Sequence, residues 1–481
     1  MKLLLLKPPK EYQVWAGVPD VFNDQRAHVY PPMGIMQLSA YLKANTPHDI
    51  HMLDAVPHFW TTEETARRAA ALKPDVIGMT ATSHGVLSVA MMARALKAAA
   101  PDTRILLGGP FVSAFPEYAL AVPEIDVAVH GDGEEPTRAL LDVLADGADP
   151  VDVPGVLWRR DGEVVDNGPA EPFKDLDALP LPDREGLPND KYYTPSNAYG
   201  MTSTVMGSRG CPNRCVFCDV PHRFRARSPA HVVDELEECV NRYGIEEVHF
   251  IDDIFNISTQ RVVAIAEEIL RRNVTIKWGF KASCRQVDRE MLRIARRAGC
   301  FRLHYGVETH SNAGLEALQK DLTLDRIFEV FAMTREEGLV SIAYMMIGCP
   351  HEASAEDIRQ VKPFMRKLDP DYVVYSLFTP YPDTRIFQTG AELGLWAPDV
   401  WTDFLRDPRP GVKLPTMWTQ YMDEPTLLEL FKDVNRAFYF SPRVVYRTLR
   451  GLRSPSHLAR VARGGLSVAK LQLIRPGSRR I

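Results

Sequence analysis

Residues 206–229, MGSRGCPNRCVFCDVPHRFRARSP, hold three cysteines, Cys211, Cys215 and Cys218, within eight consecutive positions. The chain has only seven cysteines in 481 residues, and all of them lie between positions 211 and 349. An odd number of cysteines in a protein that we expect in a reducing compartment argues against a disulfide framework. The closely spaced trio therefore indicates ligand chemistry, and the strands around it must be interpreted with that in view.

This segment follows the first of six β-rich runs that alternate with helical stretches from about residue 199. The runs are TSTVMGSRG, EEVHFIDDIF, TIKWGFKAS, FRLHYGVET, VSIAYMMIGCP and DYVVYSLFTPYP. Six such units predict a partial (β/α)6 TIM-type barrel over residues 199–400. The chemistry of such barrels lies at the carboxyl ends of the strands, so we expect the cysteines in a loop on that face.

Residues 1–150 alternate short apolar runs with helical stretches, which predicts an α/β domain with a doubly wound, Rossmann-like parallel sheet. Ligands of such sheets bind at the carboxyl ends of the strands. Small or polar residues follow three successive strands there, and glycine lets a ligand approach the backbone closely. These residues are Thr82, Ser83, Gly108, Gly109, Gly131, Gly133 and Glu134.

Two further segments differ in composition. Residues 151–198 predict a proline-rich linker with little structure of its own, apart from a hairpin around Asp161 and Gly162. Residues 401–481 predict a helical, basic C-terminal region, since 441–481 contain ten Lys or Arg and no Asp or Glu. That basic stretch either packs one side on the barrel or meets a membrane or another anionic surface.

The composition narrows the class of protein. With 45% hydrophobic residues and a net charge of −5, the chain reads as globular and gives no reason to expect nucleic-acid binding. The start, MKLLLLKPPK, fits a buried first strand better than a signal peptide, and no run of about 18 apolar residues predicts a membrane span. We therefore expect a cytoplasmic protein.

Three thiols from one loop suggest an incomplete metal site. A structural zinc site normally takes four ligands, and His222, four residues after Cys218, is a possible fourth. A 4Fe–4S cluster also normally takes four thiolates, so three would leave one iron open to a substrate or cofactor. A zinc-stapled binding module is the non-enzymatic alternative.

With Phe217 directly before the third cysteine, this CxxxCxxC segment resembles the radical S-adenosylmethionine superfamily. The resemblance implies that Cys211, Cys215 and Cys218 hold a 4Fe–4S cluster whose fourth iron binds the amino and carboxyl groups of S-adenosylmethionine. An electron from the reduced cluster then cleaves the sulfonium and yields a 5′-deoxyadenosyl radical. The protein supplies geometry and a dry site for this chemistry.

The resemblance also assigns residues at the other strand ends. Asp252 and Asp253 match polar groups near the methionine amine, and Glu308 matches an acidic residue that contacts the cofactor. Gly348 lies where relatives pair their backbone with adenine. Arg285 fits a position after the third strand, with no role assigned. Cys349 is a candidate hydrogen-atom donor or substrate contact, although packing is the preferred explanation.

The first domain resembles the cobalamin-binding subclass of this superfamily, which includes the anaerobic magnesium-protoporphyrin monomethyl ester cyclase and many methyltransferases. One departure is that the D-x-H-x-x-G motif is absent. His51 in DIHMLD lies in a strand and is expected to be packed or partly exposed. The strand-end residues from Thr82 to Glu134 are then the predicted cobalamin contacts.

The resemblance implies methylation of an unactivated carbon, with cobalamin as the methyl carrier. The apolar segments SLFTPYPDTRIF and LGLWAPDVWTDF, together with the basic tail, favour a sizeable and partly apolar small molecule as the substrate. The alternatives are an oxidative, cyclase-type reaction on a tetrapyrrole-like substrate and a radical enzyme without cobalamin. A small redox protein such as flavodoxin or ferredoxin is the expected electron donor.

Overall fold

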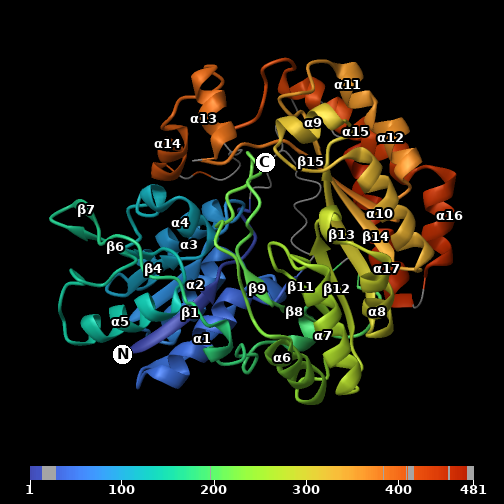
Figure 1. Ribbon diagram of the computed structural model, residues 1–481. Coiled ribbons are helices and arrows are strands. Elements are labelled where there is room, and N and C mark those ends of the chain that lie inside the picture. Colours follow the sequence, from blue (N-terminus) through green and yellow to red (C-terminus); the bar gives the residue numbers. More distant parts are fainter. Residues whose placement is uncertain are drawn as a thin grey trace.

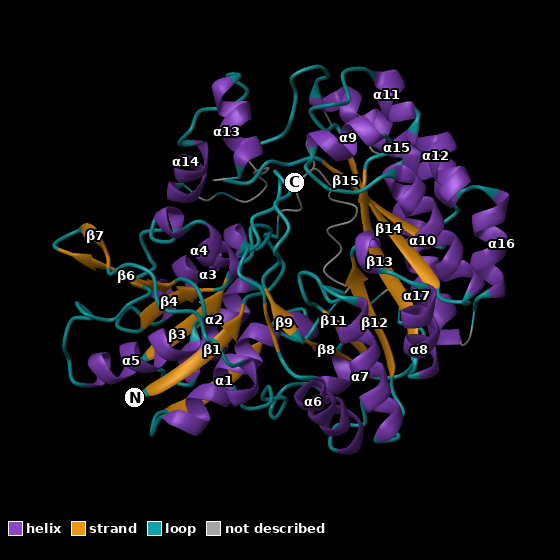
Figure 2. Ribbon diagram, viewed as in Figure 1, coloured by secondary structure: helices purple, strands orange, loops and turns teal. Residues whose placement is uncertain are grey.

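A seven-stranded sheet forms the first part of the chain, in the order β2-β1-β3-β4-β5-β6-β7 (Figures 1 and 2). The first five strands are parallel, and the β6–β7 hairpin extends the sheet in antiparallel pairing from β5. The order 2-1-3-4-5 is a doubly wound topology, as the sequence predicted. The strands are β1 (Lys2–Lys7), β2 (Asp49–Asp54), β3 (Val76–Thr80), β4 (Arg104–Gly108), β5 (Val127–Val129), β6 (Val156–Arg160) and β7 (Glu163–Asp166).

Alternating strand residues build a core on each face of this sheet, because successive side chains of a strand point to opposite faces. Leu4 and Leu6 pack under one helical layer, and Leu3 and Leu5 pack under the other. The first layer consists of α2 (Thr62–Ala71), α3 (Val86–Ala99) and α4 (Pro110–Ala114), and the second of α1 (Met33–Asn45) and α5 (Glu134–Ala145).

A second, six-stranded parallel sheet forms the barrel half, in the order β15-β14-β13-β12-β11-β8. In the part of the chain that the structure describes, β8 and β15 do not pair, so this barrel is partial, as predicted. The strands are β8 (Thr202–Val205), β11 (Glu247–Phe250), β12 (Lys277–Ala282), β13 (Cys300–Glu308), β14 (Val340–Ile347) and β15 (Tyr372–Leu377).

Helices cover the outer face of this second sheet and bury one large apolar core with it (Figure 1). They are α6 (Pro229–Asn241), α7 (Thr259–Arg271), α8 (Arg289–Arg297), α9 (Asn312–Ala317), α10 (Leu324–Glu336), α11 (Ala355–Arg359) and α12 (Val361–Leu368).

The structure is a computed structural model. It describes residues 1–13, 29–194, 197–382, 384–407, 409, 416–452 and 455–473. Parts of the predicted basic stretch, 453–454 and 474–481, lie outside the described residues. No helix among the described residues is long and apolar enough to cross a membrane.

The predicted linker is more structured than its composition suggested. Its hairpin joins the first sheet, and Arg184 is fully buried against α6, where its guanidinium pairs with Glu235 at 2.5 Å and donates to the carbonyl of Thr204 at 2.9 Å. Proline content predicts local flexibility, but a buried ion pair across 51 residues leaves no local signal. The segment therefore fastens the two halves together.

The chain after β15 first returns to the N-terminal half. Helices α13 (Arg385–Glu392) and α14 (Val400–Arg406) pack on the face covered by α3 and α4, with Trp401 fully buried. The last helices, α15 (Glu424–Tyr439), α16 (Pro442–Arg450) and α17 (Pro455–Leu471), pack on the barrel. On α16, Arg443 and Arg447 pair with Asp369, while Tyr446 and Leu449 are exposed.

Candidate functional site at the junction of the two halves

The cysteine loop lies between the two sheets (Figure 1). A short antiparallel pair, β9 (Ser208–Arg209) and β10 (Arg225–Ala226), closes its base, with Arg209 opposite Arg225. Gly210 has φ +81°, and a Cβ there would lie 2.3 Å from the carbonyl oxygen of Arg223. Only glycine fits this turn, which leads directly into Cys211.

All three predicted cluster cysteines are free thiols of intermediate exposure. Burial raises the pKa of Cys211 and Cys215, and it raises the pKa of Cys218 to about 12, so these thiols hold their protons at neutral pH. A metal must displace these protons on binding. His222 is exposed, and within the described ranges no three His, Cys, Asp or Glu side chains are gathered to hold a single metal ion. Three thiols in one loop fit a cluster that spreads its ligands over several irons.

Asp252 and Asp253 follow β11 and bond to the base of the cysteine loop. Asp252 accepts hydrogen bonds from the Gly207 N–H at 3.0 Å and from the Ser208 hydroxyl, and Asp253 accepts one from the Gly210 N–H at 3.1 Å. Burial raises the pKa of both carboxyls, that of Asp252 to about 6. These two predicted site residues therefore fix the segment that leads into Cys211.

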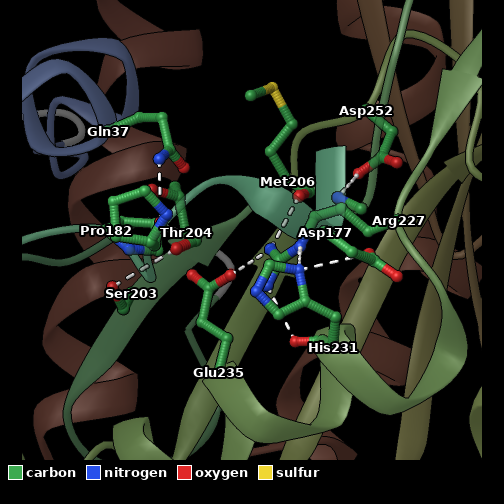
Figure 3. Close-up of polar contacts among 12 residues, drawn as sticks. Gln37, Asp177, Pro182, Ser203, Thr204, Met206, Arg227, His231, Glu235 and Asp252 are labelled. Atoms are coloured by element: carbon green, nitrogen blue, oxygen red, sulfur yellow. Dashed lines mark hydrogen bonds and ion pairs between the residues drawn. The ribbon is translucent and has the colours of Figure 1, made fainter. Parts of the chain in front are cut away.

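A buried ionic network supports the same segment from the helical side (Figure 3). Arg227 donates to the carbonyl of Met206 at 3.0 Å and also pairs with Glu235 on α6. Because Glu235 also pairs with Arg184, one carboxylate joins the linker, α6 and the start of the cysteine segment. Neither arginine carried a sequence signal.

Glu308 ends β13 with φ +68° and pairs with Lys320 at 2.7 Å, both side chains being largely buried. Burial lowers the pKa of Lys320, but the Glu308 carboxylate more than offsets this and leaves it raised. The lysine in turn lowers the pKa of Cys215, against the larger effect of burial. The structure thus brings the predicted Glu308 beside the cysteine loop through a lysine that sequence analysis missed.

The turn after β14 is shaped by a residue that sequence analysis also missed. Glu352 accepts hydrogen bonds from the backbone N–H groups of Gly348 at 2.7 Å and Cys349 at 2.9 Å. Gly348 has φ +79°. The Cys349 thiol is 1% exposed in an apolar cluster that Phe217 packs against, and burial raises its pKa well above the ordinary value.

Arg285, in the turn that follows β12, contacts the cysteine loop. Its guanidinium donates to the Asn213 side chain at 3.3 Å and pairs with Asp321 at 2.9 Å. It lines an open surface hollow of about 860 Å³ together with Asn312, Glu316 and other polar residues.

The predicted cobalamin contacts lie along the carboxyl edge of the first sheet. Thr82 is exposed and Ser83 is buried after β3, and Gly108 ends β4. Gly109 has φ +97°, and a Cβ there would meet the Thr80 hydroxyl at 2.3 Å. Gly131 has φ +82° with nothing within 4 Å of a Cβ position, which leaves the room beside the backbone that a large ligand needs.

The last two of these predicted contacts, Gly133 and Glu134, begin α5, and Glu134 faces the cysteine loop. Its carboxylate pairs with Arg209 at 2.5 Å, and the neighbouring Asp132 pairs with both Arg209 (3.0 Å) and Arg225. Glu134 is therefore bonded to the other half of the molecule. By contrast, His51 is 45% exposed on β2 and pairs with Asp49, so it is a partly exposed strand residue as expected.

Comparison with known proteins agrees with this two-part layout. Residues 19–141 match the B12 binding domain, and residues 205–361 match the Radical SAM superfamily. An uncharacterized methyltransferase of Pyrococcus horikoshii is 27% identical over 454 residues, which cover 93% of this chain and 95% of the relative. The anaerobic magnesium-protoporphyrin IX monomethyl ester cyclase of Rubrivivax gelatinosus is 28% identical over 376 residues, 76% of this chain and 66% of the cyclase.

A solved structure shares the fold over the whole chain. The radical S-adenosylmethionine methyltransferase TsrM of Kitasatospora setae, with cobalamin and a [4Fe-4S] cluster bound, superposes with a TM-score of 0.74. The two are 18% identical, and the match covers 98% of this chain and 99% of TsrM.

Proposed function

Since the chain joins a B12 binding domain to a radical S-adenosylmethionine barrel and so belongs to the cobalamin-binding radical S-adenosylmethionine enzymes, we propose that it methylates an unactivated carbon of a small molecule. The observation that supports this most directly is the contact between the two halves at the cysteine loop. Methyl transfer needs both cofactors at one place, and Arg209 joins the loop of one domain to the strand-end loop of the other.

In this proposal Cys211, Cys215 and Cys218 hold the cluster, and Phe217 packs beside them. When bound, the cluster and cobalamin supply the electron that cleaves S-adenosylmethionine and the methyl group that is transferred. Asp252 and Asp253 hold the start of the loop in place through backbone hydrogen bonds. Lys320 supplies positive charge that favours the thiolate of Cys215.

The remaining site residues orient the cofactors. We assign Glu308 and Gly348 to S-adenosylmethionine, with Arg285 positioning the loop through Asn213. Glu352 fixes the Gly348 turn, so the backbone there is preorganised for a ligand. Thr82, Ser83, Gly108, Gly109, Gly131 and Gly133 are assigned to cobalamin, whereas Glu134 and Asp132 act toward the cysteine loop. Cys349 is assigned to packing, because its thiol is enclosed by apolar side chains.

A cyclase-type oxidation is the second candidate, favoured by the similarity to the Rubrivivax cyclase. The two reactions give products of different mass, since methylation adds one methylene unit to the substrate. Part of the same proposal is that the enzyme works in the cytoplasm with a flavodoxin or ferredoxin as electron donor. The exposed Tyr446 and Leu449 beside the arginines of α16 support a peripheral membrane contact.

The test is anaerobic reconstitution with iron, sulfide and cobalamin, followed by turnover with S-adenosylmethionine labelled in its methyl group. We expect iron and sulfide to be retained, 5′-deoxyadenosine to be released and the label to enter a small molecule. Cys218→Ser should abolish cluster retention, and Cys239→Ser, at a buried helical position, should leave it unchanged. Wild-type protein that never retains iron, or never releases 5′-deoxyadenosine, would refute the proposal.

A further inference from the structure

The inward face of the barrel sheet is unusually polar. Val248, Phe250, Leu303 and Tyr305 pack outward under the helices, so the residues that alternate with them point to the barrel interior. Barrels of this type normally fill that space with branched apolar side chains. Here β11 to β14 place there Glu247, His249, Gly279, Lys281, Arg302, His304 and Tyr344.

The lowest level of this interior is a closed structural pair. Arg302 and Glu247 are 3% and 1% exposed and pair at 3.2 Å. Glu247 also accepts hydrogen bonds from the backbone N–H groups of Ala198 and Tyr199. Because the charges of Arg302 and Glu247 neutralise each other, this pair needs no ligand to explain its burial.

The next level contains two neighbouring histidines. His249 and His304 are 6% and 7% exposed, and their ring centroids are 4.7 Å apart. His304 Nδ1 shares a hydrogen bond of 2.9 Å with the Tyr344 hydroxyl. His249 Nδ1 and His304 Nε2 have no hydrogen-bond partner among the described residues. Buried polar atoms are nearly always paired, so two such atoms side by side indicate a group that binds between or above them.

The same level also carries a cation. Lys281 on β12 is paired in register with His304 on β13, so the two lie side by side on the same face. Its side chain is exposed, and within the described ranges it makes no hydrogen bond or ion pair. Besides the larger effect of burial, the positive charge of Lys281 lowers the pKa of His249, His304 and Asp253. Asp253 is nevertheless not within ion-pair distance of the lysine, and its carboxylate accepts a hydrogen bond from the Gly210 N–H instead.

From this geometry we infer that Lys281, His249 and His304 form a subsite for an anionic group of the substrate, a carboxylate or a phosphate. The ammonium supplies the charge, and His304 supplies a hydrogen bond from Nε2–H when its Nδ1 accepts from the Tyr344 hydroxyl, while His249 lies beside it. Along β13 the subsite lies roughly 13 Å before Glu308, at about 3.3 Å per residue. It therefore anchors one end of a substrate whose other end reaches the cofactors.

This inference rests on the proposed function and adds an anionic group to the sizeable, partly apolar substrate that the sequence predicted. A carboxylate is also present in S-adenosylmethionine, so the experiment must separate the two sources. The reconstituted holoenzyme is examined by saturation-transfer NMR with three matched probes, phenylacetate, 2-phenylethanol and phenethylamine. We expect the wild type to bind phenylacetate more tightly than either other probe.

The matched variants are Lys281→Met and Lys277→Met on the same strand, Lys277 lying over the ring of Tyr199 at the opposite end of β12. Losing one charged hydrogen-bond partner should weaken phenylacetate binding by about tenfold or more in Lys281→Met, while Lys277→Met should bind phenylacetate as the wild type does. His304→Gln should weaken it as well. Binding of labelled S-adenosylmethionine, measured by equilibrium dialysis, should be unchanged in Lys281→Met.

Three results would overturn the subsite: a wild type without preference for phenylacetate, an equal loss in Lys277→Met, or a loss of S-adenosylmethionine binding in Lys281→Met. The last result would show that Lys281 binds the carboxylate of S-adenosylmethionine and not that of the substrate. Failure of the proposed function is distinguishable, because it appears as absent 5′-deoxyadenosine release by the wild type, whatever the probes do.

Discussion

Arg209 of the cysteine loop and Glu134 of the first domain pair at 2.5 Å across the junction between the two halves. The same guanidinium pairs with Asp132, and Arg225, which lies opposite Arg209 at the base of the loop, reaches Asp132 as well. Asp252 and Asp253 bond the same base from the barrel side. The entry to the cysteine loop is therefore held by both domains at once, and a change in either is felt there.

We predict that Asp132→Asn loosens this junction without unfolding either domain. Methyl transfer depends on a fixed distance between two cofactors, and small misplacements are costly. The variant should retain iron and release 5′-deoxyadenosine, while methylated product per 5′-deoxyadenosine falls at least about tenfold. Both products are measured in one chromatographic run.

The matched control is Asp142→Asn on α5, the helix that begins two residues after Asp132, where the carboxylate pairs with Arg138 and His48. It should leave the product ratio unchanged. Hydrogen exchange of the cofactor-free protein gives a readout independent of turnover, with faster exchange expected in residues 207–210 of Asp132→Asn alone. An unaltered ratio together with unaltered exchange would show that the junction does not position the loop.

Periodicity and spacing were sufficient to predict both sheets and the cysteine loop. Every predicted strand of the two series is present. The parallel strands of the first sheet carry a nearly continuous apolar signal, and β11 to β15 carry apolar residues at alternate positions. The linker was misjudged because Arg184 is paired with Glu235, a partner 51 residues away. Arg209 and Lys320 were missed for the same reason, since their charges are meaningful only beside Glu134 and Glu308. Glu352 was also missed, although it lies only four residues after Gly348, close enough in sequence for its carboxylate to bond to that turn.

Removing the charge of Lys320 should make Cys215 a poorer ligand. Burial already raises the pKa of Cys215, and Lys320 partly counteracts this, so Lys320→Met should raise the pKa further and lower the thiolate fraction. We expect slower alkylation of Cys215 by iodoacetamide in the cofactor-free protein, and weaker cluster retention after reconstitution. Peptide mass spectrometry measures the first effect. Lys320→Arg, which keeps the charge, should alkylate at the wild-type rate, and identical rates in all three proteins would contradict the assignment.

The buried carboxyl of Asp252 should make stability depend on pH. Burial raises its pKa from 3.8 to about 6, so between these values the folded state keeps a proton that the unfolded state has lost. The contribution of Asp252 to the free energy of unfolding is therefore greatest below the unfolded pKa. This contribution falls by about 3 kcal/mol as the pH rises through about 6. Asp252→Asn cannot ionise and escapes this loss.

The thermal midpoint of Asp252→Asn, relative to wild type, should therefore be higher at pH 7 than at pH 4.5. The cofactor-free protein is the right material, because bound cofactors would add their own pH dependence. Asp325→Asn, at an exposed position on α10, serves as the control and should show the same small difference at both pH values. A constant difference for Asp252→Asn would mean that the carboxyl titrates normally.

Gly348→Ala separates two demands on the turn after β14. A left-handed φ of +79° costs alanine about 1 kcal/mol, and the new Cβ would also lie 2.9 Å from the Leu427 side chain. Gly394→Ala, at φ +72° with nothing within 4 Å, carries the conformational cost alone. We expect a larger fall in thermal midpoint for Gly348→Ala than for Gly394→Ala, and weaker binding of S-adenosylmethionine in the first variant only.

Adding Leu427→Ala to Gly348→Ala relieves the contact with the Leu427 side chain but not the backbone strain. If the turn serves the cofactor through its backbone shape, this double variant should recover binding in part; full recovery would assign the whole effect to Leu427.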